Sequence, residues 1–234
     1  MPMAGQYRSE RAPGRFITLE GGEGAGKSTQ CERLKRRLEA RGIRVVTTRE
    51  PGGSPRAEEI RSFLLFGGAR RFGPFAETLL FASARADHLD TCIRPALDEG
   101  AFVICDRFAD STRVYQGAVG QVPLRLVSAL ERVAVGRTRP DLTLILDVPA
   151  KLGLARASQR RELAGGAADR YEAESLAFHG RVREAFLAIA AVEPERCAIV
   201  EAAGPPDSVE RLIWAEVEAR LLTPEGPLEE GALG

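Results

Sequence analysis

Gly21-Gly22-Glu23-Gly24-Ala25-Gly26-Lys27-Ser28-Thr29 is the stretch that decides the fold, because it fits the phosphate-binding pattern G-x-x-x-x-G-K-[ST]. Glycines allow the backbone to turn so that successive N–H groups point into one hollow, which binds phosphate oxygens. Lys27 is placed to reach the β- and γ-phosphates of a nucleotide, and Ser28 offers a hydroxyl to Mg²⁺. A short apolar strand over 16–19 precedes the loop, and apolar side chains recur at helical spacing after it. This order favours ATP binding by all nine residues over a chance glycine-rich turn.

The overall composition excludes several classes of partner. The 234 residues suffice for one domain with a full core, and Lys+Arg and Asp+Glu both number 33, which gives a formal net charge of zero. A broad nucleic-acid surface needs a basic excess, so we expect no nucleic-acid partner. Residues 1–15 lack the apolar centre of a signal peptide, and no apolar run approaches the length of a membrane span. We therefore expect a cytoplasmic protein without a membrane partner.

Apolar strands and helical segments alternate along the chain. After the strand over 16–19, further strands are predicted at 43–48, 102–105, 142–146 and 197–200, with helices between them. These strands are continuous apolar runs, as in a parallel sheet that is buried on both faces. The pattern predicts an α/β fold: a doubly wound, five-stranded parallel sheet with helices on both faces, of the P-loop NTPase type.

The same pattern predicts the division of the chain. We expect a single domain over 16–222 with a short arginine-bearing lid at about 156–171, a flexible N-terminal extension over 1–15 and a C-terminal tail over 223–234. The longest helix is predicted over 75–97, with an apolar stripe facing the core that includes Phe75, Leu79, Leu89 and Ile93. Another helix is predicted from Tyr171 to Ala191.

Charged residues fall where the predicted strands end. Glu20, Arg49, Asp106 and Asp147 hold such positions, and open parallel sheets bind their ligands at the carboxyl ends of the strands. In a P-loop protein an aspartate like Asp106 lies near Mg²⁺, and Arg107 beside it could hold a second phosphate. The alternative is a surface Asp-Arg pair that caps a helix, and the apolar strand before it favours the functional interpretation.

Two further groups of residues allow either a binding role or an ordinary structural one. Phe81 and Arg85 lie four residues apart and share a helix face, so they could stack on a base and hydrogen-bond its edge. Helical spacing alone favours a core phenylalanine with an extended arginine. Arg156, Arg160, Arg161 and Arg170 cluster around a Gly/Ala-rich break over 164–168, where a lid could deliver an arginine to the phosphates. A solvated basic helix face is the equal alternative.

Longer motifs follow the P-loop in a fixed order. They are Thr48-Arg49-Glu50-Pro51-Gly52-Gly53, Leu79-Leu80-Phe81-Ala82-Ser83-Ala84-Arg85, Asp106-Arg107-Phe108-Ala109-Asp110-Ser111-Thr112 with Tyr115-Gln116-Gly117, and Asp169-Arg170-Tyr171-Glu172. In this order the motifs are far more specific than a P-loop alone. From Phe16 to about Leu187 the chain resembles the bacterial thymidylate kinases.

The resemblance implies a function and a set of site residues. It implies Mg²⁺-dependent transfer of the γ-phosphoryl group of ATP to dTMP, giving dTDP and ADP for dTTP biosynthesis, by a homodimer. The residues implied to bind dTMP are Phe81, Arg85, Thr112 and Gln116 for the base, Tyr115 for the deoxyribose, and Arg49, Arg61 and Arg107 for the acceptor phosphate. The catalytic set is Lys27, Glu20, Asp106, Arg160 and Arg156, with Ser28 and Asp106 for the metal. A cis Glu50–Pro51 peptide bond is also implied.

One departure from the family pattern affects the lid. Family members usually run almost directly from an Arg-Gly-Glu-Leu motif to Asp-Arg, whereas Ala164 to Ala168 intervene here. The resemblance favours Arg160 as the lid arginine that reaches the phosphates, with Arg156 second. The longer lid leaves the choice between these two arginines open.

Three other functions fit parts of the same pattern. A kinase of another nucleoside monophosphate would share the P-loop and the lid, but not Phe81, Arg85 and Gln116 in these contexts. A P-loop GTPase needs an Asn-Lys-x-Asp guanine reader, and the sequence contains no asparagine. An ATPase that acts on a macromolecule commonly has a glutamate next to its metal-binding aspartate, whereas Arg107 follows Asp106 here.

Overall fold

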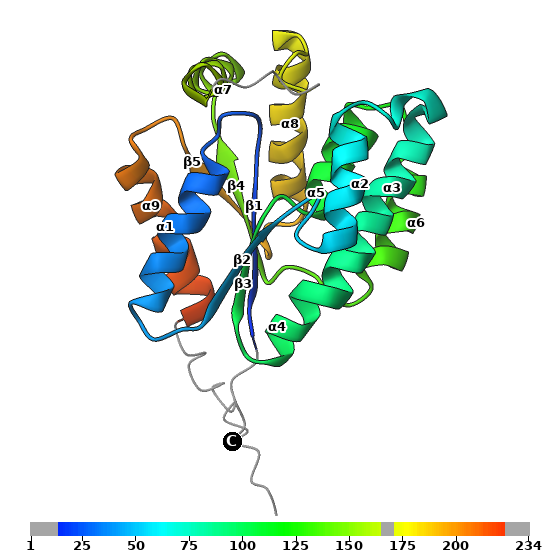
Figure 1. Ribbon diagram of the computed structural model, residues 1–234. Coiled ribbons are helices and arrows are strands. Elements are labelled where there is room, and N and C mark those ends of the chain that lie inside the picture. Colours follow the sequence, from blue (N-terminus) through cyan, green and yellow to red (C-terminus); the bar gives the residue numbers. More distant parts are fainter. Residues whose placement is uncertain (1–13, 165–170, 223–234) are drawn as a thin grey trace, which may run out of the picture.

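A computed structural model describes residues 14–164 and 171–222 of the chain. Within these residues lies a sheet of five parallel strands in the order β2-β3-β1-β4-β5 (Figure 1). The strands are β1 (Phe16–Glu20), β2 (Val45–Arg49), β3 (Phe102–Asp106), β4 (Leu142–Asp147) and β5 (Cys197–Glu201). The predicted five-stranded, all-parallel sheet is confirmed.

Helices connect the strands and cover the sheet. They are α1 (Lys27–Glu39), α2 (Pro55–Leu65), α3 (Gly73–His88), α4 (Arg94–Asp98), α5 (Ala109–Thr112), α6 (Leu124–Val135), α7 (Ala150–Ala164), α8 (Leu176–Val192) and α9 (Pro206–Val217). The 3-10 turn η1 (Arg70–Phe72) and the π turns η2 (Leu89–Ile93), η3 (Arg113–Ala118) and η4 (Glu218–Leu222) extend or join them. Most of the expected N-terminal extension, the C-terminal tail and the centre of the lid lie outside the described residues.

Helices lie on both faces of the sheet, as predicted for a doubly wound fold. On one face α1 and α9 pack against the strands (Figure 1). There Leu34 and Trp214 join a core that includes Leu144. On the other face η2 and α4 pack on β1 and β3, while α8 packs on β4 and β5. The edge strands β2 and β5 are partly exposed, and β3, β1 and β4 are almost entirely buried.

The register of the strands gathers the predicted strand-end residues at one edge of the sheet. Arg49, at the end of β2, pairs with Asp106 of β3, and Asp106 also pairs with Leu19 of β1. The strands β1, β2 and β3 fill one half of the sheet, and β4 and β5 fill the other. The loop after β1 therefore lies where the strand order changes direction, which is where open parallel sheets bind their ligands.

The longest predicted helix is correct in extent, and its predicted apolar stripe is buried at Leu89 and Ile93 but not at Phe75 and Leu79. It consists of α3, η2 and α4, and the π turn η2 interrupts the α-helical winding. Phe75 and Leu79, predicted to face the core, are 47% and 39% exposed, whereas Arg85 and His88 are buried. Periodicity failed here because polar side chains with hydrogen-bond partners occupy the inner face of α3 in place of apolar ones.

The helix that was predicted from Tyr171 begins at Leu176 instead. Ser175 is its N-cap, and the Ser175 hydroxyl accepts a hydrogen bond from the Phe178 N–H at 3.2 Å. This cap satisfies one of the N–H groups that have no partner within the helix. The residues from Tyr171 to the cap form a turn, which carries the Tyr171 side chain to the site.

Candidate active site

The glycine loop between β1 and α1 has the backbone of a phosphate-binding loop. Gly26, the N-cap of α1, has φ of 90°, and Gly24 has φ of 66°, both in the left-handed region that favours glycine. Gly24 also packs closely against α7. A Cβ at Gly24 would stand only 1.9 Å from the Gly153 carbonyl oxygen, so a larger residue would clash there. The loop is thus packed on the helix that leads to the lid, and the dipole of α1 favours an anion at the end of the loop.

Lys27 and Ser28, the first residues of α1, lie beside the end of β3. The buried Lys27 ammonium donates to the carbonyl oxygens of Gly21 (3.1 Å) and Gly22 (2.8 Å), and burial lowers the pKa of this group. The Ser28 hydroxyl donates to Asp106, with 2.6 Å between Oγ and Oδ2. A hydroxyl and a carboxylate so close together are hard oxygen ligands that suit Mg²⁺.

A cavity of about 440 Å³ extends from the P-loop to α2 and α3, and its volume falls in the range of small-molecule sites. The predicted site residues that line it are Glu23, Gly24, Ala25, Gly26, Lys27, Ser28, Thr29, Arg49, Arg61, Phe81, Arg85, Asp106, Arg107, Thr112, Tyr115, Gln116 and Arg160. Four predicted residues in the described part of the chain do not line it: Glu20, Gly21, Gly22 and Arg156.

A buried ion pair holds Arg85 in the wall of the cavity. Its Nε donates to Glu50 Oε2 at 2.7 Å, and both side chains are 4% exposed. Its Nη2 donates to the Phe108 carbonyl oxygen (3.1 Å) and to the Thr112 hydroxyl (3.0 Å). Phe81, one turn earlier on α3, lines the same cavity. The structure therefore brings Phe81 and Arg85 together, with a guanidinium group whose direction is set by its partners.

Glu50, directly after β2, also binds His88. The Glu50–Pro51 peptide bond is cis, as the resemblance implied. His88 Nδ1 lies 3.2 Å from Glu50 Oε1, and its Nε2 lies 2.6 Å from the Thr48 hydroxyl. Burial lowers the pKa of His88, but hydrogen bonds with Cys92 and Glu50 outweigh burial and raise this pKa to about 9. His88 is fully buried and supports Glu50 from behind, which is a structural role.

Arg107 has a left-handed backbone, with φ of 71°, and a guanidinium group with several partners. Its Nη2 donates to Glu23 at 2.5 Å, and its Nη1 donates to the Gly21 carbonyl oxygen (3.1 Å) and the Ser111 hydroxyl (3.2 Å). The same group lies over the Tyr115 ring, 5.2 Å from its centroid. A non-glycine residue in this region is strained, and such residues cluster at functional sites.

Arg49 and Arg61 approach the same cavity from β2 and α2. Arg49 Nη2 donates to both oxygens of Glu58, at 3.1 and 3.2 Å. Arg61 Nη1 donates to the Pro51 carbonyl oxygen at 2.6 Å. The arginines that the resemblance implied for the acceptor phosphate, including Arg107, are thus gathered around one space.

The two candidate lid arginines point in different directions. Arg160 lines the cavity, and its Nη2 donates to Glu172 at 3.1 Å. Arg156 donates from Nη1 and Nη2 to the carbonyl oxygens of Ala202 (2.8 Å) and Ala203 (2.6 Å), in the loop after β5. Arg156 therefore ties α7 to the body of the fold, and of these two arginines Arg160 faces the cavity.

Glu20 lies beneath the cavity rather than in its wall. Its buried carboxyl accepts hydrogen bonds at Oε1 from the Phe108 N–H (2.7 Å) and the Ser111 N–H (3.2 Å), and at Oε2 from the Ser111 hydroxyl (2.7 Å). Burial and the negative charge of Asp110 raise the pKa of Glu20 to about 7. This carboxyl therefore holds the segment after β3 in place.

Sequence reasoning did not predict every residue of the wall. Further lining residues in the described part of the chain are Glu50, Pro51, Leu65, Phe108, Ser111 and Tyr171. All except Leu65 stand inside the motifs that follow the P-loop, so their place beside predicted residues was the available signal. Leu65, an apolar residue of α2, has no feature in the sequence that separates it from a core residue.

The fold and the cavity define a P-loop nucleotide kinase. The family model described as thymidylate kinase matches residues 19–213. The chain is 53% identical over 216 residues to thymidylate kinase of Nitrobacter winogradskyi, which covers 92% of this chain and 93% of the relative. It is 56% identical over 212 residues to thymidylate kinase of Rhodopseudomonas palustris strain TIE-1, covering 90% and 91%. The chain therefore belongs to the thymidylate kinase family and is a phosphotransferase.

A solved structure supports the same assignment. The crystal structure of thymidylate kinase from Ehrlichia chaffeensis matches with a TM-score of 0.68 and 32% identity, covering 88% of this chain and 99% of that one. In residues 14–164 and 171–222, no helix has the length and apolar character that a membrane crossing requires. The same residues contain no group of three His, Cys, Asp or Glu side chains that could hold a metal ion by itself.

Replacing Glu20 by glutamine is expected to change how stability depends on pH. The pKa of this carboxyl rises from 4.5 to about 7 on folding, so the folded protein binds the proton more tightly than the unfolded one. The resulting stabilisation is complete below pH 4.5 and is lost as the pH rises through 7. The free energy of unfolding of the wild type, relative to Glu20→Gln, should therefore fall by up to about 3 kcal/mol between pH 5 and pH 8.

Urea unfolding of both proteins at the two pH values measures this difference. Leu212→Ala, which truncates a half-exposed leucine on α9, is a control for the loss of stability itself. Its difference from the wild type should be the same at both pH values, because no charge changes. If the free energy of unfolding of the wild type minus that of Glu20→Gln stays constant or rises between pH 5 and pH 8, the raised pKa of Glu20 is contradicted.

Proposed function

We propose that this cavity transfers the γ-phosphoryl group of ATP to dTMP, giving dTDP and ADP in the synthesis of dTTP. The observation that carries the proposal is the continuity of one cavity from the P-loop to Phe81 and Arg85. A donor nucleotide on the P-loop and an acceptor base at α3 would meet with their phosphates between them. Arg49 and Arg107 line this middle region, where positioning and charge neutralisation supply most of the catalysis.

The loop over 21–29 is the proposed donor site. Its backbone N–H groups and the N-terminus of α1 would bind the phosphates of ATP. Lys27 would exchange its bonds to the Gly21 and Gly22 carbonyl oxygens for bonds to the β- and γ-phosphates. Its ammonium is already held inside the site, so little reorganisation separates the two arrangements.

Ser28 and Asp106 are the residues proposed to hold Mg²⁺, since their oxygen atoms lie 2.6 Å apart at the end of β3. When bound, the ion would neutralise charge on the phosphate oxygens. Asp106 keeps its place because it pairs with Leu19 in the register of β3 and β1. Glu20 would act on the same region through the backbone after β3, since its oxygens accept bonds from Phe108 and Ser111.

Phe81 and Arg85 are the proposed readers of the base. The Phe81 ring would stack on the thymine, and Arg85 would donate to its edge. Thr112 and Gln116 would line the rest of the base pocket. Gln116 would be oriented by the bond from its Nε2 to the Tyr171 hydroxyl at 2.9 Å. Tyr115 would lie against the deoxyribose and disfavour a 2′-hydroxyl. One methyl group, worth about 1–3 kcal/mol, separates thymine from uracil, so dUMP should be a poor substrate.

Arg160 is the proposed lid residue at the transferring phosphoryl group. It lines the cavity beside the P-loop, and its bond to Glu172 is partly exposed, so the side chain can change partners. An arginine that reaches the equatorial oxygens contributes about 10³–10⁵ in rate. Arg156, the second candidate, is engaged by the carbonyl oxygens after β5, and its proposed part is to hold α7 in place.

We also propose that the chain acts as a homodimer in the cytoplasm. An apolar patch on α2, η1 and α3 consists of Phe63, Phe66, Phe72, Phe75 and Leu79, which are 37% to 91% exposed. The Phe63 and Phe72 rings lie 6.3 Å apart, so the patch is partly continuous. Patches of this kind usually mark protein–protein contacts. The cysteines of the described residues are free, as is common in a reducing compartment.

An assay of ADP release tests the proposed reaction. ATP and Mg²⁺ are offered with dTMP, dUMP, dGMP, dCMP, dAMP and UMP in parallel reactions. We expect strong turnover with dTMP, kcat/KM about 10–200-fold lower with dUMP, and negligible turnover with the others. Chelation of Mg²⁺ should abolish the activity, because the phosphate charges are then no longer neutralised.

The pattern of acceptors separates the ways in which the proposal can fail. Preferred turnover with another monophosphate would keep the P-loop assignment and overturn the base pocket. ATP hydrolysis that is indifferent to every acceptor would overturn the transfer of phosphate to a nucleotide.

Alanine at Arg160 should lower kcat by about 10³-fold or more, because the transferring phosphoryl group loses its lid arginine. Alanine at Arg156 should lower kcat by less than about tenfold, because the bonds that it removes lie outside the cavity. Arg211→Ala, at an exposed site on α9, controls for the loss of a surface charge. Equal losses in kcat for the variants at 156 and 160 would refute this division of roles.

Phe75→Glu should separate the proposed dimer, because it puts a charge into the apolar patch. Analytical ultracentrifugation at matched concentrations is expected to give twice the monomer mass for the wild type and the monomer mass for the variant. Val192→Glu is the control, because Val192 is 80% exposed at the end of α8 and lies outside the patch. A wild type that sediments as a monomer would rule out the dimer.

A further inference from the structure

The segment 109–118 forms one wall of the cavity, although little in its own backbone stabilises it. It consists of the four-residue helix α5 and the π turn η3. It carries Thr112, Tyr115 and Gln116, which line the cavity. So short a helix is marginal by itself, and π turns are rare and occur mostly at functional sites. Contacts with other elements must therefore set the position of this wall.

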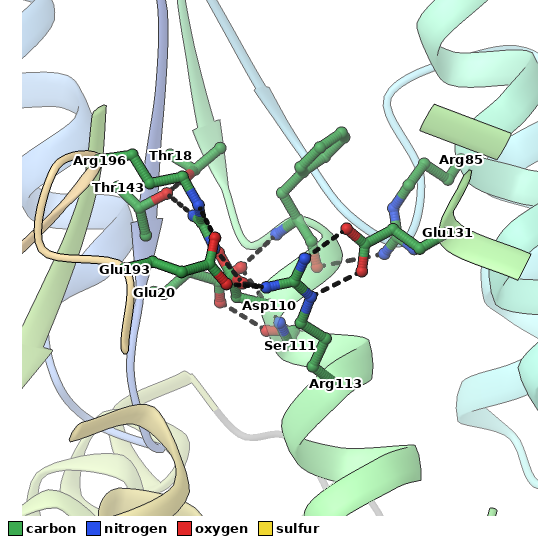
Figure 2. A network of polar contacts seen from close by, with 11 residues as sticks. Thr18, Glu20, Arg85, Asp110, Ser111, Arg113, Glu131, Thr143, Glu193 and Arg196 are labelled. Atoms are coloured by element: carbon green, nitrogen blue, oxygen red, sulfur yellow. Dashed lines mark hydrogen bonds and ion pairs between the residues drawn. The ribbon is translucent and has the colours of Figure 1, made fainter. Parts of the chain in front are cut away.

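Asp110 and Arg113 lie three residues apart on the same segment and belong to a network of charged side chains (Figure 2). We define the ion-pair network as Asp110, Arg113, Glu131, Glu193 and Arg196. Asp110 is 2% exposed, and its two oxygens accept from Arg196, Nη2 to Oδ1 at 2.8 Å and Nη1 to Oδ2 at 2.7 Å. A bidentate bond between a guanidinium and a carboxylate fixes their relative orientation as well as their distance.

Arg196 is itself tied to the centre of the sheet. Its Nη1 also donates to the Thr143 hydroxyl of β4 at 2.8 Å, and that hydroxyl lies 2.8 Å from the Thr18 hydroxyl of β1 (Figure 2). Its Nε donates to Glu193 at 2.7 Å, between α8 and β5. Because β1 and β4 are almost entirely buried, Arg196 fixes the position of Asp110 relative to the central strands of the sheet.

Arg113 is held from two further elements. Its Nε and Nη2 donate to the two oxygens of Glu131 on α6, at 2.7 and 2.6 Å. Its Nη1 donates to Glu193 at 2.5 Å. Arg113 therefore fixes the first residue of the π turn against α6 and against the connection from α8 to β5, away from the cavity that the turn lines.

Four consecutive residues of the wall are thus each held by a different element. Asp110 is bound from the start of β5 by Arg196, and Arg113 is bound from α6. Between them, Ser111 is bound by Glu20 of β1, and the Thr112 hydroxyl accepts from Arg85 of α3. The network therefore acts on the side of the wall opposite to the side that meets a nucleotide.

We propose that Asp110 and Arg196 are positioning residues for the acceptor nucleotide, an inference that rests on the proposed binding of dTMP by Thr112, Tyr115 and Gln116. Their ion pair holds the wall at the distance from Phe81 and Arg85 that a pyrimidine deoxynucleotide requires. Displacement of such a wall by about 1 Å can lower the rate of the reaction by up to about 10²-fold. No P-loop residue belongs to the network, so loss of the pair should affect the acceptor side much more than ATP binding.

The test compares the KM for dTMP with the KM for ATP in variants that remove the pair. In the double variant Asp110→Leu with Arg196→Met, apolar side chains of similar volume replace both charges, an exchange that often preserves stability. The conservative single variant Arg196→Lys keeps the charge but loses the bidentate bond to Asp110. For both, we expect the KM for dTMP to rise about 10- to 100-fold, and the KM for ATP to stay within about twofold.

Arg183→Met is the matched control. Arg183 makes a similar bidentate bond to Asp147, at 2.6 and 2.8 Å, between α8 and β4. Within the described part of the chain, its side chain forms no hydrogen bond with residues 109–118. This variant should leave the KM for dTMP unchanged. Thermal unfolding of each variant shows whether it is folded at the assay temperature; if the double variant is not, Arg196→Lys carries the test.

Each outcome bears on the proposal. A selective rise in the KM for dTMP supports it. An unchanged KM for dTMP in a folded variant, or an equal rise in both KM values, overturns it, since the pair would then serve general stability alone. A wild type that does not phosphorylate dTMP overturns the proposed function itself, and this is seen in the unsubstituted protein before any variant is compared.

Discussion

The site depends on the hydrogen bonds that the buried carboxyl of Glu20 accepts. A carboxyl at the end of the central strand cannot be left without hydrogen-bond partners, because burial of an unpaired polar group is strongly unfavourable. Its partners are N–H and O–H groups of Phe108 and Ser111, so the segment after β3 must lie against the end of β1. Asp106 and Arg107 are thereby brought to the P-loop, and the donor and acceptor halves of the cavity share one anchor.

Arginine side chains carry much of the architecture around this anchor. Arg85, Arg107 and Arg196 each bind groups from at least two other elements, with bonds that leave the guanidinium in several directions at once. A planar group with five donors can do this, whereas a lysine acts as a single flexible charge. Close contact between Gly24 and Gly153 adds a direct connection between the P-loop and the lid helix α7. The walls of the cavity are therefore held by contacts within the chain itself.

Much of the site could be predicted, and the rest failed for identifiable reasons. The P-loop, the parallel strands and the charged residues at their ends follow from local spacing, and all were found in their expected places. The prediction of the buried face of α3 was wrong because Arg85 is polar. The partners that allow its burial, Glu50 and Thr112, lie far away in the sequence. Arg156 and Arg160 stand one helical turn apart, and the resemblance favoured Arg160 but left the choice open; in the structure the loop after β5 binds Arg156, while Arg160 lines the cavity.

The sequence by itself determined the fold class, the phosphate-binding loop and the family, because each depends on patterns within short stretches or on the order of motifs. Only the tertiary structure decided which charged groups are buried and with which partners they pair. Asp110 and Arg196 are separated by 86 positions, and nothing in either neighbourhood indicates the other. The physical reason is that a buried charge is tolerated only where the folded chain brings an opposite charge and hydrogen-bond donors to it, and that meeting is a property of the whole fold.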